Sequence, residues 1–352
     1  MTRTWRWTAL AASAVTAVAA LLIGCATPPP VTGPDLPAQP GTQAAEDGSH
    51  HWQDFDWSDP ARHRAVPVRV YWPSGEPPAT GWPVVVFSHG MGGSRRGYSY
   101  LGSYWAAHGI VAMHVQHIGS DRRLWAGGFG WSNSLTLVRR LQHAAQPEEA
   151  IERTQDIRFA LDQLLAGPLG RQLDATRLAI AGHSYGANTS LLIAGAKVPT
   201  PLSGLAGGAA QASTLADPRF KAAILISAPP FYGEGDPAPI LSGIAIPTLH
   251  ISATADEITI PGYYSGPSDR VALFDAIGGP RKALAMFSGG SHSIFTDRTN
   301  TGGFELNPKV KAATRELSLA YLRLVLDGEA EPLRDWQQRH GALLARWQAP
   351  GG

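Results

Sequence analysis

Residues 177–196 read RLAIAGHSYGANTSLLIAGA, and this stretch decides the fold. RLAIA is a short β-type run, and ANTSLLIAGA after it has the character of a helix. Between them lies a G-x-S-x-G sequence centred on Ser184. A strand, a sharp glycine-flanked turn that carries a serine, and a helix together form a nucleophile elbow. The stretch therefore predicts an α/β-hydrolase fold with Ser184 as its nucleophile.

The rest of the chain alternates short β-type runs with longer helical patterns. Several of the β-type runs are nearly continuous in Val, Ile, Leu and Ala, as in parallel strands that are buried on both faces. We therefore predict an α/β protein with a mostly parallel central sheet and helices on both faces. The expected strands are 66–72, 83–88, 110–115, 177–182, 222–227, 248–253 and 283–287, and the expected helices are 98–108, 148–165, 187–196 and 309–326.

The N-terminus has the layout of an export signal. Arg3 and Arg6 precede an apolar stretch over 8–23, and Leu-Ile-Gly leads into Cys25. A basic region, a short apolar region and small residues are typical of a signal peptide, and the final residues resemble a bacterial lipobox, whose cysteine is acylated. We predict a lipoprotein signal peptide over 1–24 and an exported protein anchored by lipid to the cell envelope, at the outer membrane or the cell surface. An ordinary signal peptide with an incidental cysteine is the alternative.

Composition divides the remaining chain into two parts. Residues 25–50 are rich in Pro, Gly and Ala and predict a flexible tether. Residues 51–350 are expected to form one catalytic domain, which must stand without disulfides because the chain has a single cysteine. An insertion at 117–147, rich in aromatic residues and glycine, interrupts the alternation. It is interpreted as a lid or cleft wall, or as a surface loop that covers the sheet edge.

Charge and motifs argue against several classes of function. The formal net charge is +1, from 29 basic and 28 acidic residues. No basic stripe of the kind that binds nucleic acid is present. The twelve histidines show no ligand spacing typical of a metal site, and no dinucleotide or phosphate-loop motif occurs. We therefore expect no nucleic-acid partner, no catalytic metal and no cofactor.

A serine nucleophile needs a base, and in this fold the histidine follows the serine in the chain. Three histidines qualify. His250 lies inside a strand-like run, where a role in the core is favoured, and His340 lies in a polar segment that predicts an exposed helix. His292 follows a strand within a loop of small residues. Catalytic side chains gather at such carboxyl ends of parallel strands, so His292 is the predicted base.

The acid should hold the imidazole in the correct tautomer. Asp256 follows the strand-like TLHISA and lies between Ser184 and His292 in the chain. Glu257 is adjacent and chemically able, and is the alternative. Asp256 is the predicted acid.

Two backbone N–H groups should bind the oxyanion of the tetrahedral intermediate. One is that of Tyr185, the residue after the nucleophile. The other should come from the glycine-rich loop SHGMGG after the strand PVVVF, and we predict the N–H of Met91. The alternative is that His89 and Met91 pack beneath the site.

Residues 83–117, PVVVFSHGMGGSRRGYSYLGSYWAAHGIVAMHVQH, resemble the platelet-activating-factor acetylhydrolase and predicted dienelactone-hydrolase-like branch of the α/β-hydrolases. The resemblance continues through AIAGHSYGANTS and covers roughly residues 60–300. It implies a Ser-Asp-His triad, here Ser184, Asp256 and His292, with the oxyanion donors above and ester substrates with short or modified acyl groups.

Two departures from the family pattern stand out. The acetylhydrolases place the acid after the strand that follows the elbow strand, where this chain has Ser227. Here the acid comes one strand later, as in dienelactone hydrolases. Those enzymes use a cysteine nucleophile, whereas this chain has a serine.

The leading hypothesis is hydrolysis of small-molecule carboxylic esters through an acyl-enzyme intermediate. A second hypothesis is hydrolysis of phospholipid or other lipid esters at the membrane surface, which the predicted anchor and the insertion motivate. The third is an inactive hydrolase fold that serves as a binding lipoprotein.

Overall fold

The structure is a computed structural model that describes residues 41–125, 140–197, 215–230, 235–260, 263–279 and 281–351. These residues form a ten-stranded sheet and a separate two-stranded hairpin. In the large sheet the strands are β1 (Gln43–Ala44), β2 (His50–Asp59), β3 (Arg64–Pro73), β4 (Trp82–Ser88), β5 (Val111–Val115), β6 (Leu173–His183), β7 (Phe220–Ile226), β8 (Thr248–Ala255), β11 (Lys282–Ser291) and β12 (Leu344–Gln348). The hairpin consists of β9 (Ile258–Ile260) and β10 (Tyr263–Ser265).

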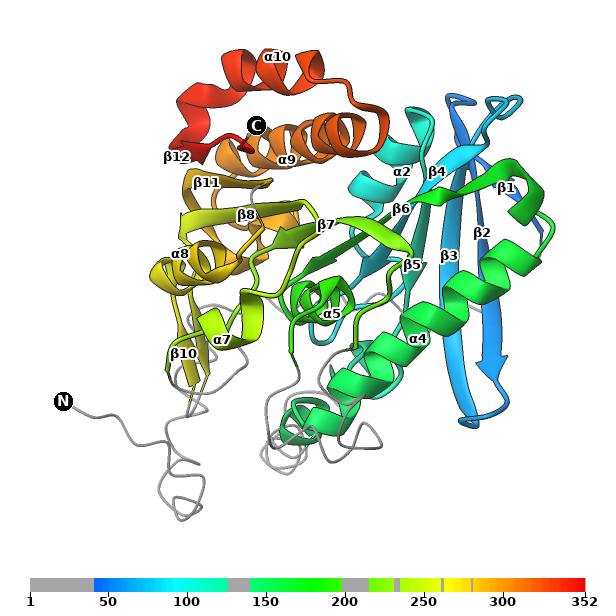
Figure 1. Cartoon of the computed structure of the whole chain (residues 1–352), viewed down its shortest axis with the longest axis horizontal. Coiled ribbons are helices and arrows are strands. Elements are labelled where there is room, and N and C mark those ends of the chain that lie inside the picture. The colour runs from blue at the N-terminus through cyan, green and yellow to red at the C-terminus, as the bar shows by residue number, and fades with distance from the viewer. Residues whose placement is uncertain are drawn as a thin grey trace.

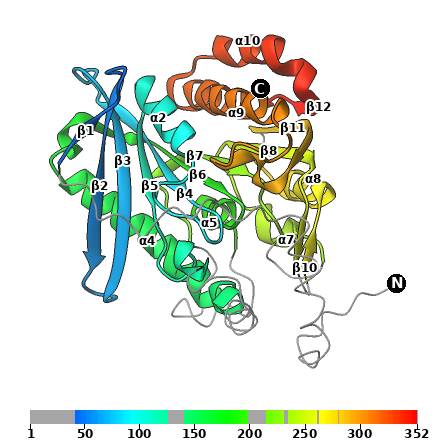
Figure 2. The same ribbon diagram turned by 180° about the vertical axis from the view of Figure 1, so that it is seen from behind.

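The helices cover both faces of the large sheet, as Figures 1 and 2 show. They are α2 (Ser99–Ala107), α4 (Pro147–Ala166), α5 (Tyr185–Ala194), α7 (Ala238–Leu241), α8 (Pro267–Ala276), α9 (Leu306–Leu322) and α10 (Glu331–His340). Shorter turns are η1 (Arg122–Trp125), η2 (Gly170–Gln172), η3 (His292–Phe295), the π-helical Arg323–Asp327 and η5 (Gly341–Leu343).

The strand order is β1-β2-β3-β5-β4-β6-β7-β8-β11-β12. The six strands from β5 to β11 in this order are parallel to one another, whereas β1, β2 and β3 on one side and β12 on the other pair in antiparallel fashion. A mostly parallel sheet between helices is the architecture that the sequence predicted. The protein has an α/β-hydrolase fold.

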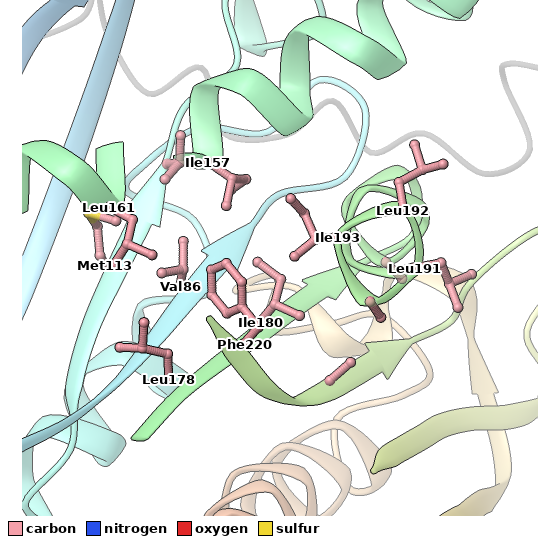
Figure 3. Close-up of a cluster of buried hydrophobic side chains, with 14 of the residues drawn as sticks. Val86, Met113, Ile157, Leu161, Leu178, Ile180, Leu191, Leu192, Ile193 and Phe220 are labelled. Carbon is pink, nitrogen blue, oxygen red and sulfur yellow. The ribbon is translucent and has the colours of Figure 1, made fainter. Parts of the chain in front are cut away.

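Alternating strand residues supply two separate cores. On β4, Val84 and Val86 face the core under α4 and α5, whereas Val85 and Phe87 face the core under α2 and α9. Figure 3 shows the first core, where Val86 lies among residues of the neighbouring strands and the two helices. Because both faces of the central strands are buried, their sequences are apolar throughout instead of alternating. This packing on both faces of the sheet holds the carboxyl ends of the central strands in place.

All seven predicted strands and all four predicted helices are present, with small differences at their ends. The antiparallel edge strands β1, β2 and β12 were not predicted. β2 reads HHWQDFDWSD, which mixes charged and aromatic residues. It is defined by its pairing with β3 and not by its own pattern. β1 lies inside the predicted tether, where Gln43 and Ala44 pair with β2.

Several predictions concern residues outside the described part of the chain. These are the signal peptide over 1–24, the lipidation at Cys25, most of the tether and residues 126–139 of the predicted insertion. Among the described helices, none has both the length and the apolar character needed to cross a membrane. The predicted exposed helix that contains His340 is α10, and its Trp336 is fully buried against α9, where its indole N–H donates to the carbonyl oxygen of Ala313 at 2.8 Å.

Candidate active site

The G-x-S-x-G sequence forms a sharp turn between β6 and α5. Ser184 sits at the turn with φ 54° and ψ −121°, a left-handed conformation that L-residues rarely adopt. A Cβ on Gly182 would collide with the backbone of Gly186, and a Cβ on Gly186 would collide with the backbone of Ser88 in β4. Both glycines are thus required by close backbone packing, which holds the strained serine at the carboxyl edge of the sheet.

Replacing Gly186 with alanine should destabilise the fold. The new Cβ would overlap backbone atoms of Ser88 and His89, which cannot rotate away. We expect the free energy of unfolding to fall by about 2 kcal/mol or more. Denaturant titration measures this change, with Gly243→Ala as the control. Gly243 is exposed and has open space around it, so an equal effect of both substitutions would contradict the packing argument.

The structure brings the three predicted side chains into one hydrogen-bonded chain. His292 is the first residue of η3, immediately after β11, and Asp256 follows β8. The Oγ of Ser184 lies 2.9 Å from Nε2 of His292. The Nδ1 of the same ring lies 2.7 Å from Oδ1 of Asp256. A carboxylate can only accept, so Nδ1 carries the proton and Nε2 is free to accept the serine hydroxyl proton.

Asp256 is completely buried, and both of its carboxylate oxygens have polar partners. Its Oδ2 accepts a hydrogen bond from Ser252 at 2.7 Å, and Arg270 of α8 lies 3.5 Å from its Oδ1. Burial by itself disfavours the ionised form. The hydrogen bond and charge of His292, together with the charge of Arg270, outweigh this effect and hold the pKa of Asp256 below its ordinary value. The carboxylate is therefore available to orient and stabilise a charged imidazole.

The two predicted oxyanion donors flank Ser184. Tyr185 follows it directly, and the loop that carries Met91 packs against it, since a Cβ on Gly90 would lie 3.2 Å from the Cβ of Ser184. Within the described residues, the backbone N–H groups of Met91 and Tyr185 have no hydrogen-bond acceptor. Unpaired donors beside a nucleophile are the requirement for binding an oxyanion.

The alternative candidates lie elsewhere or make other contacts. His250 is buried in β8, and its ring forms a T-shaped pair with the Phe274 ring, with the ring centroids 5.2 Å apart. The Nε2 of His340 lies 2.8 Å from Oε2 of Glu316. The Oε1 of Glu257 accepts a hydrogen bond from the Tyr264 hydroxyl at 3.2 Å. None of these three residues contacts Ser184 in the described structure.

Sequence reasoning missed the residues that hold these three side chains in place. His183 of the G-x-S-x-G sequence is buried, and its Nδ1 accepts a hydrogen bond from the Tyr98 hydroxyl at 2.8 Å. Its Nε2 donates to the carbonyl oxygen of His292 at 3.0 Å, so it fixes the backbone of that residue. Burial lowers the pKa of His183 to about 3, and the ring is neutral. Arg270 lies on α8, a helix that no sequence pattern indicated.

Ser227, where the acetylhydrolases place the acid, is buried directly after β7 with φ 50°. The neighbouring strand β8 supplies Asp256 instead. In the part of the chain that the structure describes, no group of His, Cys, Asp and Glu side chains is arranged to hold a metal ion.

Comparison with known proteins shows similarity to acetylhydrolases. The family described as platelet-activating factor acetylhydrolase, isoform II, matches residues 63–123. The chain is similar to these acetylhydrolases. The match includes Met91 and ends before Ser184. A platelet-activating factor acetylhydrolase of Cavia porcellus is 26% identical over 155 residues, 36% of this chain and 34% of that protein. The chain thus spans about a third of the length of this relative.

Proposed function

We propose that this protein is a carboxylic-ester hydrolase that uses Ser184 as nucleophile, His292 as general base and Asp256 as the orienting acid. The observation that carries the proposal is the continuous pair of hydrogen bonds from Ser184 through His292 to Asp256, at 2.9 and 2.7 Å. The similarity to an acetylhydrolase supports the same reaction class.

The reaction follows from this geometry. His292 Nε2 takes the hydroxyl proton while Ser184 Oγ attacks the ester carbonyl carbon. The carbonyl oxygen becomes an oxyanion, for which Met91 and Tyr185 offer their free N–H groups. His292 then gives its proton to the alcohol oxygen as the C–O bond breaks, which leaves an acyl group on Ser184. Water attacks the acyl group with His292 again as base, the acid leaves, and Ser184 regains its proton.

A fluorophosphonate probe tests this proposal directly, because it reacts with serines that a base has activated. We expect mass spectrometry to find the phosphonyl group on the peptide that contains Ser184. We also expect the labelled protein to lose its activity on p-nitrophenyl acetate. A folded protein in which Ser184 stays unmodified would favour the inactive binding lipoprotein instead.

A second candidate is hydrolysis of lipid esters at the surface of a membrane or micelle. The large apolar side chains exposed in the described residues are Trp125, Tyr264 and Phe304, at 41%, 57% and 81%. The Trp125 indole donates to the carbonyl oxygen of Gly92, beside Met91. Tyr264 contacts Glu257, the neighbour of Asp256, and Phe304 lies in the loop between η3 and α9. Each exposed aromatic residue therefore belongs to or contacts a segment next to a site residue, which suits contact with lipid.

Replacing Phe304 with serine tests this candidate. If the ring enters lipid, its loss removes about 1.5 kcal/mol of apolar transfer free energy, and affinity for ester aggregates should fall about tenfold. Rates on micellar esters should then fall while rates on dissolved short-chain esters stay unchanged. Gln338→Ser, on the exposed side of α10, is the control. Equal rates for wild type and Phe304→Ser on micelles would contradict a lipid-binding role.

Export and lipidation at Cys25 are part of this second candidate. Acylation would hold the enzyme at the cell envelope, near lipid esters. The mass of the mature N-terminal peptide, compared with that of Cys25→Ser, tests it, and an unmodified or uncleaved N-terminus would contradict it.

A further inference from the structure

Arg153 of α4 is fully buried directly beneath the proposed oxyanion hole. Its Nε donates to Thr189 at 2.9 Å, and its Nη1 donates to Ser120 at 2.7 Å. Its Nη2 donates to Ser88 at 3.0 Å and to the carbonyl oxygen of His89. A buried guanidinium is costly unless its donors are satisfied, and here each nitrogen bonds to α5, to the end of β4 or to a neighbouring loop.

The guanidinium touches both halves of the oxyanion hole. On one side it holds the carbonyl oxygen of His89, which precedes Gly90 and Met91. On the other side its central carbon lies 4.4 Å from the centre of the Tyr185 ring, a cation–π contact. One side chain, from the helix α4, therefore links the two segments that carry the predicted donors.

The His89 side chain completes this arrangement. Its Nδ1 donates to the carbonyl oxygen of Gly90 at 2.6 Å, and the N–H of Gly93 donates to the same oxygen at 3.0 Å. In a trans peptide the C=O and N–H groups point in opposite directions. Because the Gly90 oxygen is held inside the loop, the N–H of Met91 in the same peptide unit must point away from it. Rotation of the His89 peptide would lose this orientation.

The charge of Arg153 is balanced through neutral bridges. The Oγ of Ser120, which accepts from Arg153, donates a hydrogen bond to Oε1 of Glu149 at 2.7 Å. Ser88 lies 3.0 Å from Nε2 of His117, whose Nδ1 lies 3.0 Å from Asp156. Among the residues that the structure describes, no carboxylate contacts the guanidinium, and its donors bond to the His89 carbonyl oxygen and to three hydroxyl groups.

We propose that Arg153 is a positioning residue that holds the Met91 and Tyr185 N–H groups where both can donate to the oxyanion. The inference rests on the proposed ester hydrolysis and adds a residue that touches no substrate. A purely structural arginine would affect the amount of folded protein, whereas a positioning residue must affect transition-state binding in the protein that is folded.

Arg153→Lys and Arg153→Met test the inference. Lysine keeps the charge but cannot reach the hydroxyl groups and the His89 carbonyl together. We expect kcat to fall by about 10-fold for lysine and about 10²-fold for methionine, with KM nearly unchanged. The kcat is expressed per Ser184 titrated by a fluorophosphonate, so unfolded protein does not contribute. A trifluoromethyl ketone, which forms a tetrahedral oxyanion adduct on the serine, should bind more weakly by similar factors.

Arg158→Met is the matched control. Arg158 lies on the same helix and donates to the carbonyl oxygens of Leu215 and Ala216, away from the site. Its kcat per titrated serine should stay within about threefold of wild type, within the range of ordinary surface substitutions. Wild-type kcat and ketone affinity in titrated Arg153→Lys would overturn the proposal, whether or not the methionine variant folds. Failure of the proposed function would show itself differently, as a wild-type protein whose Ser184 is not needed for ester hydrolysis.

Discussion

The Ser184→Ala protein is expected to hydrolyse p-nitrophenyl acetate about 10⁵-fold more slowly than wild type, in line with the loss of the serine nucleophile in enzymes that have a Ser-His-Asp triad. The substitution deletes the oxygen that lies 2.9 Å from His292 and leaves the base without a proton to take. Alanine keeps the Cβ, so the turn and the neighbouring glycines remain packed as before. Residual activity above the uncatalysed rate should come from the oxyanion donors and substrate binding alone.

The measurement is kcat on purified protein, together with fluorophosphonate labelling of every preparation to exclude contaminating esterases. Ser242→Ala is the control, since Ser242 is exposed at the end of α7. Its kcat should equal that of wild type. Retention of most of the turnover in Ser184→Ala would remove the serine from the mechanism and, with it, the proposed function.

Asp256→Asn should lower kcat by about 10⁴-fold with little change in KM. The carboxylate accepts the Nδ1 proton of His292, whereas an amide NH₂ at that position can only donate. The imidazole would then carry its proton on Nε2 and could not take one from Ser184. Glu257→Gln is the matched control, because it changes the adjacent carboxylate, which bonds to Tyr264. A larger loss in Glu257→Gln than in Asp256→Asn would assign the acid to Glu257.

The same variant has a pH signature in stability. The pKa of Asp256 is lowered from 3.8 in the folded protein. A lowered carboxyl pKa stabilises the folded state above the ordinary pKa, and this contribution is lost as pH falls through the lowered value. The wild-type free energy of unfolding, measured relative to Asp256→Asn, should therefore decrease as the pH is lowered below about 4. A pH-independent difference would show that folding does not lower the pKa of the Asp256 carboxyl.

The chemistry of the candidate site could be predicted because its members follow strands. Ser184, Asp256 and His292 each come directly after a β-type run, and parallel strands align their carboxyl ends at one edge of the sheet. Chain order then assigned the roles. The same reasoning set aside His250, because a residue inside a strand is buried in the sheet and not at its edge.

Sequence by itself determined the fold class, the strand–turn–helix at Ser184 and the buried central strands, because each is encoded in consecutive residues. It also indicated the three candidate site residues, because each follows a β-type run of its own. Only the tertiary structure decided the antiparallel edge strands, the contact of Arg270 with Asp256 and the place of Arg153 beneath the oxyanion hole. Arg153 and His89 are 64 residues apart, and Arg270 and Asp256 lie on separate elements. Contacts of this kind leave no periodic pattern, since they depend on how the helices pack against the sheet.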